Sequence, residues 1–132
     1  MSGKIYVAGP MRGIPFYNSP LFDRTADTLR ARGYQVVNPC DLDRDTYEVD
    51  FSLCPEGTEN PALLPPLPEL LLRDLDELSR CDAIALLPGY TESKGALTEL
   101  AFANFCGLRV LHWSPEDASL WFMPTGQQGE RF

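Results

Sequence analysis

Short apolar runs typical of β-strands alternate along this chain with segments of helical periodicity, and this alternation restricts the possible folds. The runs at 4–8, 34–38, 83–87 and 108–113 combine β-branched, aromatic and other apolar residues. Strands that alternate with helices are joined by right-handed crossovers, which produce a mostly parallel sheet with helices on both faces. We therefore predict an α/β fold whose sheet has four to five strands.

Three helices are predicted between these strands. The first opens at Ser19-Pro20, with Ser19 as the cap, and ends at Gly33; the second covers 67–80; the third follows the segment 93–95 and ends at Gly107. The stretch 39–66 has prolines and acidic residues without periodicity, so we interpret it as a long loop or lid. The tail 114–132 resembles a short helix start followed by apolar residues, which need burial either on the domain itself or against a second subunit at a dimer interface.

Composition narrows the class of partner. The 132 residues suit a single domain, 1–132, and the formal charge of −8 argues against unspecific nucleic-acid binding, which requires clustered Lys and Arg. No apolar run approaches a membrane span, and no signal peptide is recognisable, so we expect a cytosolic protein. The four cysteines are widely spaced and there is one histidine. We predict neither a metal nor a cofactor.

Two loops at carboxyl ends of predicted strands hold unusual residues. Arg12 lies in a glycine-containing loop after the first strand, where its guanidinium could bind a phosphate, although a surface arginine in a turn is the alternative. Ser93 and the amides near Gly95 could form an anion site at a helix N-terminus. Because ligands of parallel sheets bind beyond the strand carboxyl ends, we expect the site between these loops.

Four further side chains are candidates for chemistry. Glu99, about one turn into the third helix, is expected to be ionised by the helix dipole and could act as a nucleophile, unless it only faces solvent. Asp74 lies on an apolar stripe and needs a partner, so it could bind a sugar hydroxyl or exchange a proton with the base. Asp82 precedes a strand and has a structural alternative, and Tyr6 could stack on a sugar or belong to the core.

The segment 6–13, Asp74, Asp82 and the segment 93–99 together resemble the nucleoside 2-deoxyribosyltransferase-like family, and within it the 2'-deoxynucleoside 5'-phosphate N-hydrolases most. The resemblance implies a Rossmann- or flavodoxin-like three-layer sandwich. It also implies Glu99 as the nucleophile, Asp74 for sugar binding and acid/base chemistry, and Tyr6 as the holder of Glu99. The substrate-binding residues that we predict are Gly9, Pro10, Met11, Arg12, Gly13, Asp82, Ser93 and Gly95.

Two departures from the family pattern bear on the reaction. Leu97 replaces a glycine that the hydrolases usually have two residues before the catalytic glutamate, and the Asn-x-Asp element typical of the transferases has no counterpart. We therefore expect a hydrolase that cleaves the N-glycosidic bond of a deoxynucleoside monophosphate. A base-exchanging transferase and a non-catalytic nucleotide-binding module are the alternatives. The family also implies a homodimer or higher homo-oligomer whose subunits complete one another's sites.

Overall fold

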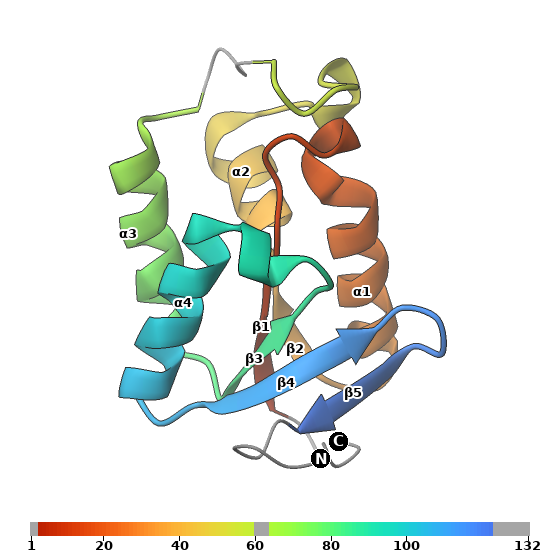
Figure 1. The fold of residues 1–132 in the computed structure, drawn as a ribbon, viewed down its shortest axis with the longest axis vertical. Helices are drawn as coiled ribbons and strands as arrows, with labels where there is room; N and C mark the ends of the chain where they lie inside the picture. The colour runs from red at the N-terminus through yellow and green to blue at the C-terminus, as the bar shows by residue number, and fades with distance from the viewer. Residues whose placement is uncertain (1–2, 60–63, 123–132) are drawn as a thin grey trace.

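The computed structural model describes residues 3–59 and 64–122, which form an α/β sandwich around one sheet (Figure 1). The sheet has five strands in the order β2-β1-β3-β4-β5; β1 to β4 pair in parallel and β5 pairs antiparallel with β4. This confirms the predicted fold class. The strands are β1 (Lys4–Ala8), β2 (Gln35–Val37), β3 (Ala83–Leu86), β4 (Arg109–Ser114) and β5 (Ser119–Phe122).

Helices cover both faces of this sheet. The helix α1 (Ser19–Ala31) lies on one face, while α3 (Leu67–Leu78) and α4 (Lys94–Phe105) pack together on the other (Figure 1). Because successive strand residues point to opposite faces, Ile5 of β1 belongs to the core beneath α1, and Tyr6 to the core beneath α3 and α4. The side chain of Tyr6 therefore lies between the sheet and those two helices.

The stretch 39–66 was wrongly predicted to be a loop throughout. The helix α2 (Pro39–Tyr47) begins it, and the short 3-10 helix η2 (Phe51–Leu53) follows. Asn38 caps α2, since its side chain accepts a hydrogen bond from the amide of Cys40, and Pro39 occupies the first turn, where its missing amide costs nothing. Asp43, on the same helix, is buried.

Two smaller predictions were also wrong. The cap position of α1 is occupied by Asn18, in a left-handed conformation and without a side-chain cap, while Ser19 is buried in the first turn. The residues after Ser114 turn back and form β5 rather than a helix, because Leu120 completes the core beneath α1. The remaining tail, residues 123–132, lies outside the described residues.

The loop that follows β1 is hydrogen-bonded to a segment about 40 residues further along the chain. The amide of Gly13 donates to the carbonyl of Gly57 at 3.1 Å, the amide of Phe16 donates to the carbonyl of Cys54 at 3.0 Å, and the Tyr17 hydroxyl donates to the carbonyl of Glu59. Gly57 has a φ of +75°, and a Cβ there would lie 2.0 Å from a backbone oxygen. We call residues 54–59 the strap. It is hydrogen-bonded to the segment after β1, whose residues Met11, Arg12 and Tyr17 line the cavity described below.

Candidate active site

A cavity of about 690 Å³ opens beyond the carboxyl ends of β1 and β3. In the strand order 2-1-3-4-5 the connections diverge at these two strands, and such a switch point is where parallel sheets bind ligands. Its walls come from the loop after β1, from α2 and α3, and from the first turns of α4. The polar lining includes Arg12, Asp43, Arg73, Asp74, Glu92, Ser93, Lys94, Thr98 and Glu99.

Glu99 is buried on the inner side of α4, with 6% of its surface exposed. The hydroxyl of Tyr6, which is fully buried, donates a hydrogen bond to Glu99 Oε2 at 2.5 Å. Burial first, and then the charge of Asp74, raise the pKa of Glu99 to about 8. This differs from the predicted dipole-stabilised anion, because Glu99 lies beyond the first turn, where desolvation outweighs the helix dipole.

Asp74 lies on the inner side of α3 and is held by its sequence neighbour. Arg73 donates from Nε and Nη2 to Asp74 Oδ1, at 3.0 and 2.7 Å. Burial raises the pKa of Asp74 to about 6, although Arg73 and the Tyr6 hydroxyl lower it. Glu99 and Asp74 thus share one cavity wall and influence each other's protonation.

Sequence reasoning missed Arg73 and Asp43. The remaining arm of the Arg73 guanidinium, Nη1, donates to Oδ1 of the buried Asp43 on α2 at 2.7 Å. Asp43 gave no signal because its segment was interpreted as a loop. For Arg73 the sequence offered only a weak indication that it belongs to the site, since a cation on an amphipathic helix usually faces solvent. The acid on an apolar stripe at position 74 was the available hint that a basic partner must lie nearby.

The predicted anion-binding residues lie at the opening of the same cavity. Ser93 caps α4, and its side chain accepts a hydrogen bond from the amide of Ala96 at 3.1 Å. Arg12 and Gly95 are exposed and line the cavity beside Ser93. Lys94 lies there too, although it was not predicted as a site residue from the sequence. A helix N-terminus with two basic side chains at a cavity mouth can bind an anionic group.

The other residues of the glycine-containing loop differ in position. Gly9, Pro10 and Met11 line the cavity. A Cβ at Gly9 would lie 2.7 Å from the Cβ of Leu87, so the glycine allows the two site loops to approach. Gly13 is not part of the lining; its amide is bound to the strap.

Asp82 is the predicted site residue that the structure separates from the others. It lies just before β3, at the amino edge of the sheet, where its Oδ2 accepts a hydrogen bond from the amide of Lys4 at 2.8 Å. The cavity lies at the carboxyl ends of the strands, at the edge of the sheet opposite Asp82. The structural alternative for Asp82 therefore applies, and we remove it from the candidate site.

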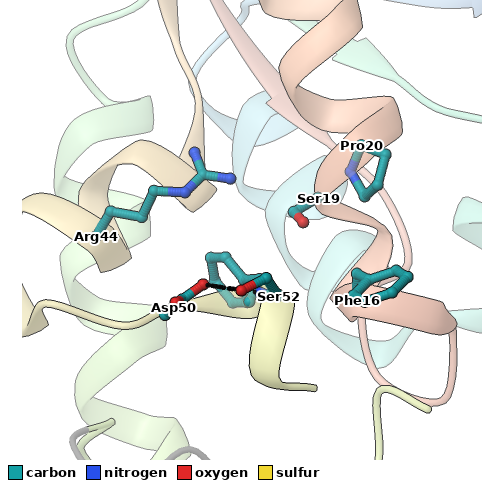
Figure 2. Close-up of a pocket in the computed structure, with 7 residues that line it drawn as sticks. Phe16, Ser19, Pro20, Arg44, Asp50 and Ser52 are labelled. Carbon is teal, nitrogen blue, oxygen red and sulfur yellow. Dashed lines mark hydrogen bonds between the residues drawn. The ribbon is translucent and has the colours of Figure 1, made fainter. Parts of the chain in front are cut away.

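A smaller hollow of about 300 Å³ has Phe51 in common with the lining of the main cavity. Figure 2 shows Arg44, Asp50 and Ser52 around it. Arg44 on its wall binds Asp23 and Asp41, and Asp50 accepts hydrogen bonds from the amide and hydroxyl of Ser52. The two charged side chains that line this hollow, Arg44 and Asp50, thus each have a hydrogen-bonded partner. We interpret this hollow as a structural corner between α1, α2 and η2.

Within residues 3–59 and 64–122, no helix is long and apolar enough to cross a membrane. The same residues include no group of three or more His, Cys, Asp or Glu side chains that could hold a metal ion.

Residues 3–112 match the family described as "Domain of unknown function (DUF4406)", and because this match spans most of the chain, the protein belongs to that family. The matched residues include Tyr6, Asp74 and Glu99, whereas β5 lies beyond them. No curated protein matches the sequence.

Proposed function

We propose that this protein hydrolyses the N-glycosidic bond of a (deoxy)nucleoside 5'-monophosphate, releasing the free base and (deoxy)ribose 5-phosphate. The observation that best supports the proposal is that buried Glu99 and partly buried Asp74 line one cavity, together with the basic side chains of Arg12 and Lys94. Paired carboxyls in different protonation states are the groups that glycoside cleavage requires.

In the proposed reaction the two carboxyl groups share one proton, which their pKa values place mainly on Glu99 in the ligand-free protein. The reactive form carries this proton on Asp74, and ionised Glu99 attacks the anomeric carbon of the sugar. The bond between that carbon and the base nitrogen breaks, its electron pair leaves with the base, and protonated Asp74 donates a proton to the departing base. Water then attacks the anomeric carbon of the glycosyl ester, Asp74 takes a proton from that water, and Glu99 leaves as a carboxylate. The Tyr6 hydroxyl fixes Oε2 of Glu99 throughout.

The phosphate would bind at the cavity mouth. Arg12 offers a planar fork of donors, Lys94 a second positive charge, and Ser93 and Gly95 lie at the N-terminus of α4. The chain as a whole carries a net charge of −8, so these two cations contrast with its overall acidic character. A nucleoside monophosphate would therefore enter with its phosphate at the mouth and its sugar beside Glu99.

Two alternatives keep the same residues. A transferase would form the same glycosyl ester and pass the sugar to a second base in place of water. A non-catalytic nucleotide-binding module is favoured by one observation: burial keeps Glu99 largely protonated near neutral pH, a state that suits a hydrogen bond to a sugar hydroxyl better than nucleophilic attack.

The test is to incubate the purified protein with a panel of deoxynucleoside and ribonucleoside monophosphates, modified pyrimidines included, and to follow free base by chromatography. We expect base release by the native chain and by Glu69→Gln, which removes an exposed carboxylate of α3, and no release by Glu99→Gln. Exchange with an added second base would indicate the transferase. Tight binding without release from any substrate would contradict both enzymatic functions.

We also propose a cytosolic homodimer. The four cysteines are free, and three of them, Cys40, Cys54 and Cys81, are buried, as suits a reducing compartment. The helix α4 exposes Leu97 and Phe105 on one stripe, with 40% and 89% of their surfaces accessible. Exposed apolar side chains at this spacing support contact with a second subunit.

A further inference from the structure

We propose that Asp43, acting through Arg73, is the positioning group that fixes the Asp74 carboxylate in the cavity wall, an inference that rests on the proposed function for its catalytic consequence. Asp43 lies on α2, in a part of the chain that contributes no other charged side chain to the cavity lining. The proposal thus gives α2 a role in positioning Asp74 of α3, which acts together with Glu99 of α4.

The geometry of the guanidinium carries the inference. One edge of Arg73, formed by Nε and Nη2, faces Asp74 Oδ1, and the remaining arm, Nη1, is bound to Asp43 Oδ1 at 2.7 Å. The guanidinium also lies over the ring of Tyr47, 5.6 Å from its centroid. A planar fork bound at both ends and supported on one face has little freedom to rotate.

The surroundings make this support necessary. Besides exposed Glu92, three carboxyl groups line the cavity from different helices: Asp43 from α2, Asp74 from α3 and Glu99 from α4. Arg73 is the cation among them, and Tyr6 of β1 donates to Glu99. Without Arg73 in this orientation, Asp74 would lose its charged partner and the proton distribution between Asp74 and Glu99 would change.

A simpler role for Asp43 predicts the opposite response. If Asp43 acted only as a nearby negative charge, the neutral variant Asp43→Asn would lower the pKa of Asp74, because Asp43 raises it. If Asp43 holds Arg73 on Asp74, its loss frees the guanidinium and the pKa of Asp74 rises. The sign of the change therefore separates positioning from simple charge repulsion.

The experiment is a carbon-detected NMR titration of the Asp74 carboxyl in the ligand-free protein. We expect Asp43→Asn to raise the Asp74 pKa by about 1 or more, since an opposite charge in contact lowers a carboxyl pKa by roughly 1–3. The same substitution in an Arg73→Gln background should no longer raise it. A single variant leaves one of these two charges without its partner and could fail to fold. The double variant removes both charges and avoids this problem. A fall in both backgrounds overturns the proposal.

Turnover provides the second measurement. We expect Arg73→Gln to lower kcat by about 10²-fold with a smaller change in KM, as misplaced catalytic groups do, and Arg73→Lys to restore part of it. Arg80→Gln, which removes an exposed arginine of the same region, should leave kcat unchanged. Equal losses in kcat for Arg73→Gln and Arg73→Lys, with an unchanged pH profile, would contradict positioning. If the native chain releases no base, the proposed function fails, whereas the titration still decides the role of Asp43.

Discussion

Replacing Glu99 by glutamine should make the free energy of unfolding less dependent on pH. The pKa of Glu99 is about 8 in the folded protein and about 4.5 in an unfolded chain. Between these values the folded state binds a proton that the unfolded state has lost, so the native protein loses stability as pH rises. The neutral glutamine has no such penalty, while it keeps nearly the same shape.

The magnitude follows from the two pKa values. Each unit of difference corresponds to about 1.4 kcal/mol, so the full effect of Glu99 is about 5 kcal/mol, of which roughly 3–4 kcal/mol develops between pH 5 and pH 8. Near pH 4.5 the protonated glutamic acid and the glutamine should be almost equally stable. At pH 8 the Glu99→Gln variant should be the more stable protein by several kcal/mol.

Urea denaturation, repeated at pH values from 5 to 8.5, measures this difference. Glu69→Gln, which removes an exposed carboxylate from α3, is the control for a change in net charge. A difference between Glu99→Gln and the native protein that stays constant across this range would refute the reasoning. It would show that the Glu99 carboxyl titrates below pH 5 and is therefore solvated or better paired than its burial indicates.

Three further predictions follow from the structure. The pH profile of kcat/KM for base release should be bell-shaped with limbs near pH 6 and pH 8, because Asp74 and Glu99 together must hold one proton; a profile flat from pH 5 to 9 would contradict this. Thermal denaturation should show Gly57→Ala to be less stable than Gly107→Ala by about 1–3 kcal/mol, because both have a positive φ but only the former meets a backbone oxygen; equal losses would contradict the close approach. Phe105→Lys should convert the proposed dimer to a monomer in sedimentation velocity, and an unchanged sedimentation coefficient would place the interface elsewhere.

The sheet could be predicted because its signals are local. The apolar run of β3 and the glycines that follow β1 and β3 indicate buried strands and site loops whatever surrounds them. The helix α2 was missed although Asn38 and Pro39 form a normal helix start, because its nine residues are mostly polar and bury few side chains. The four residues of β5 gain their strand structure from pairing with β4, which no local pattern reveals.

The candidate site was predicted in part for the same reason. Glu99 and Asp74 were found as acids in unusual positions, but their protonation depends on burial by other elements, which a sequence does not display. The contact between Arg73 and Asp43 joins residues 30 positions apart and requires α2 to be placed against α3. Asp82 was misplaced because it was taken from the family resemblance, although its position just before β3 puts it at the amino end of the strand, away from the end where parallel sheets bind ligands.

The ion pair between Asp43 and Arg73 also makes the arrangement of the site depend on the local stability of α2. Local unfolding of a short, polar helix costs little free energy compared with global unfolding, and helices of this kind open often in native proteins. Each opening of α2 would release the guanidinium from its outer anchor. Substitutions that weaken the Asn38 cap would therefore reduce the fraction of molecules with a correctly arranged site, although Asn38 is not part of the cavity lining.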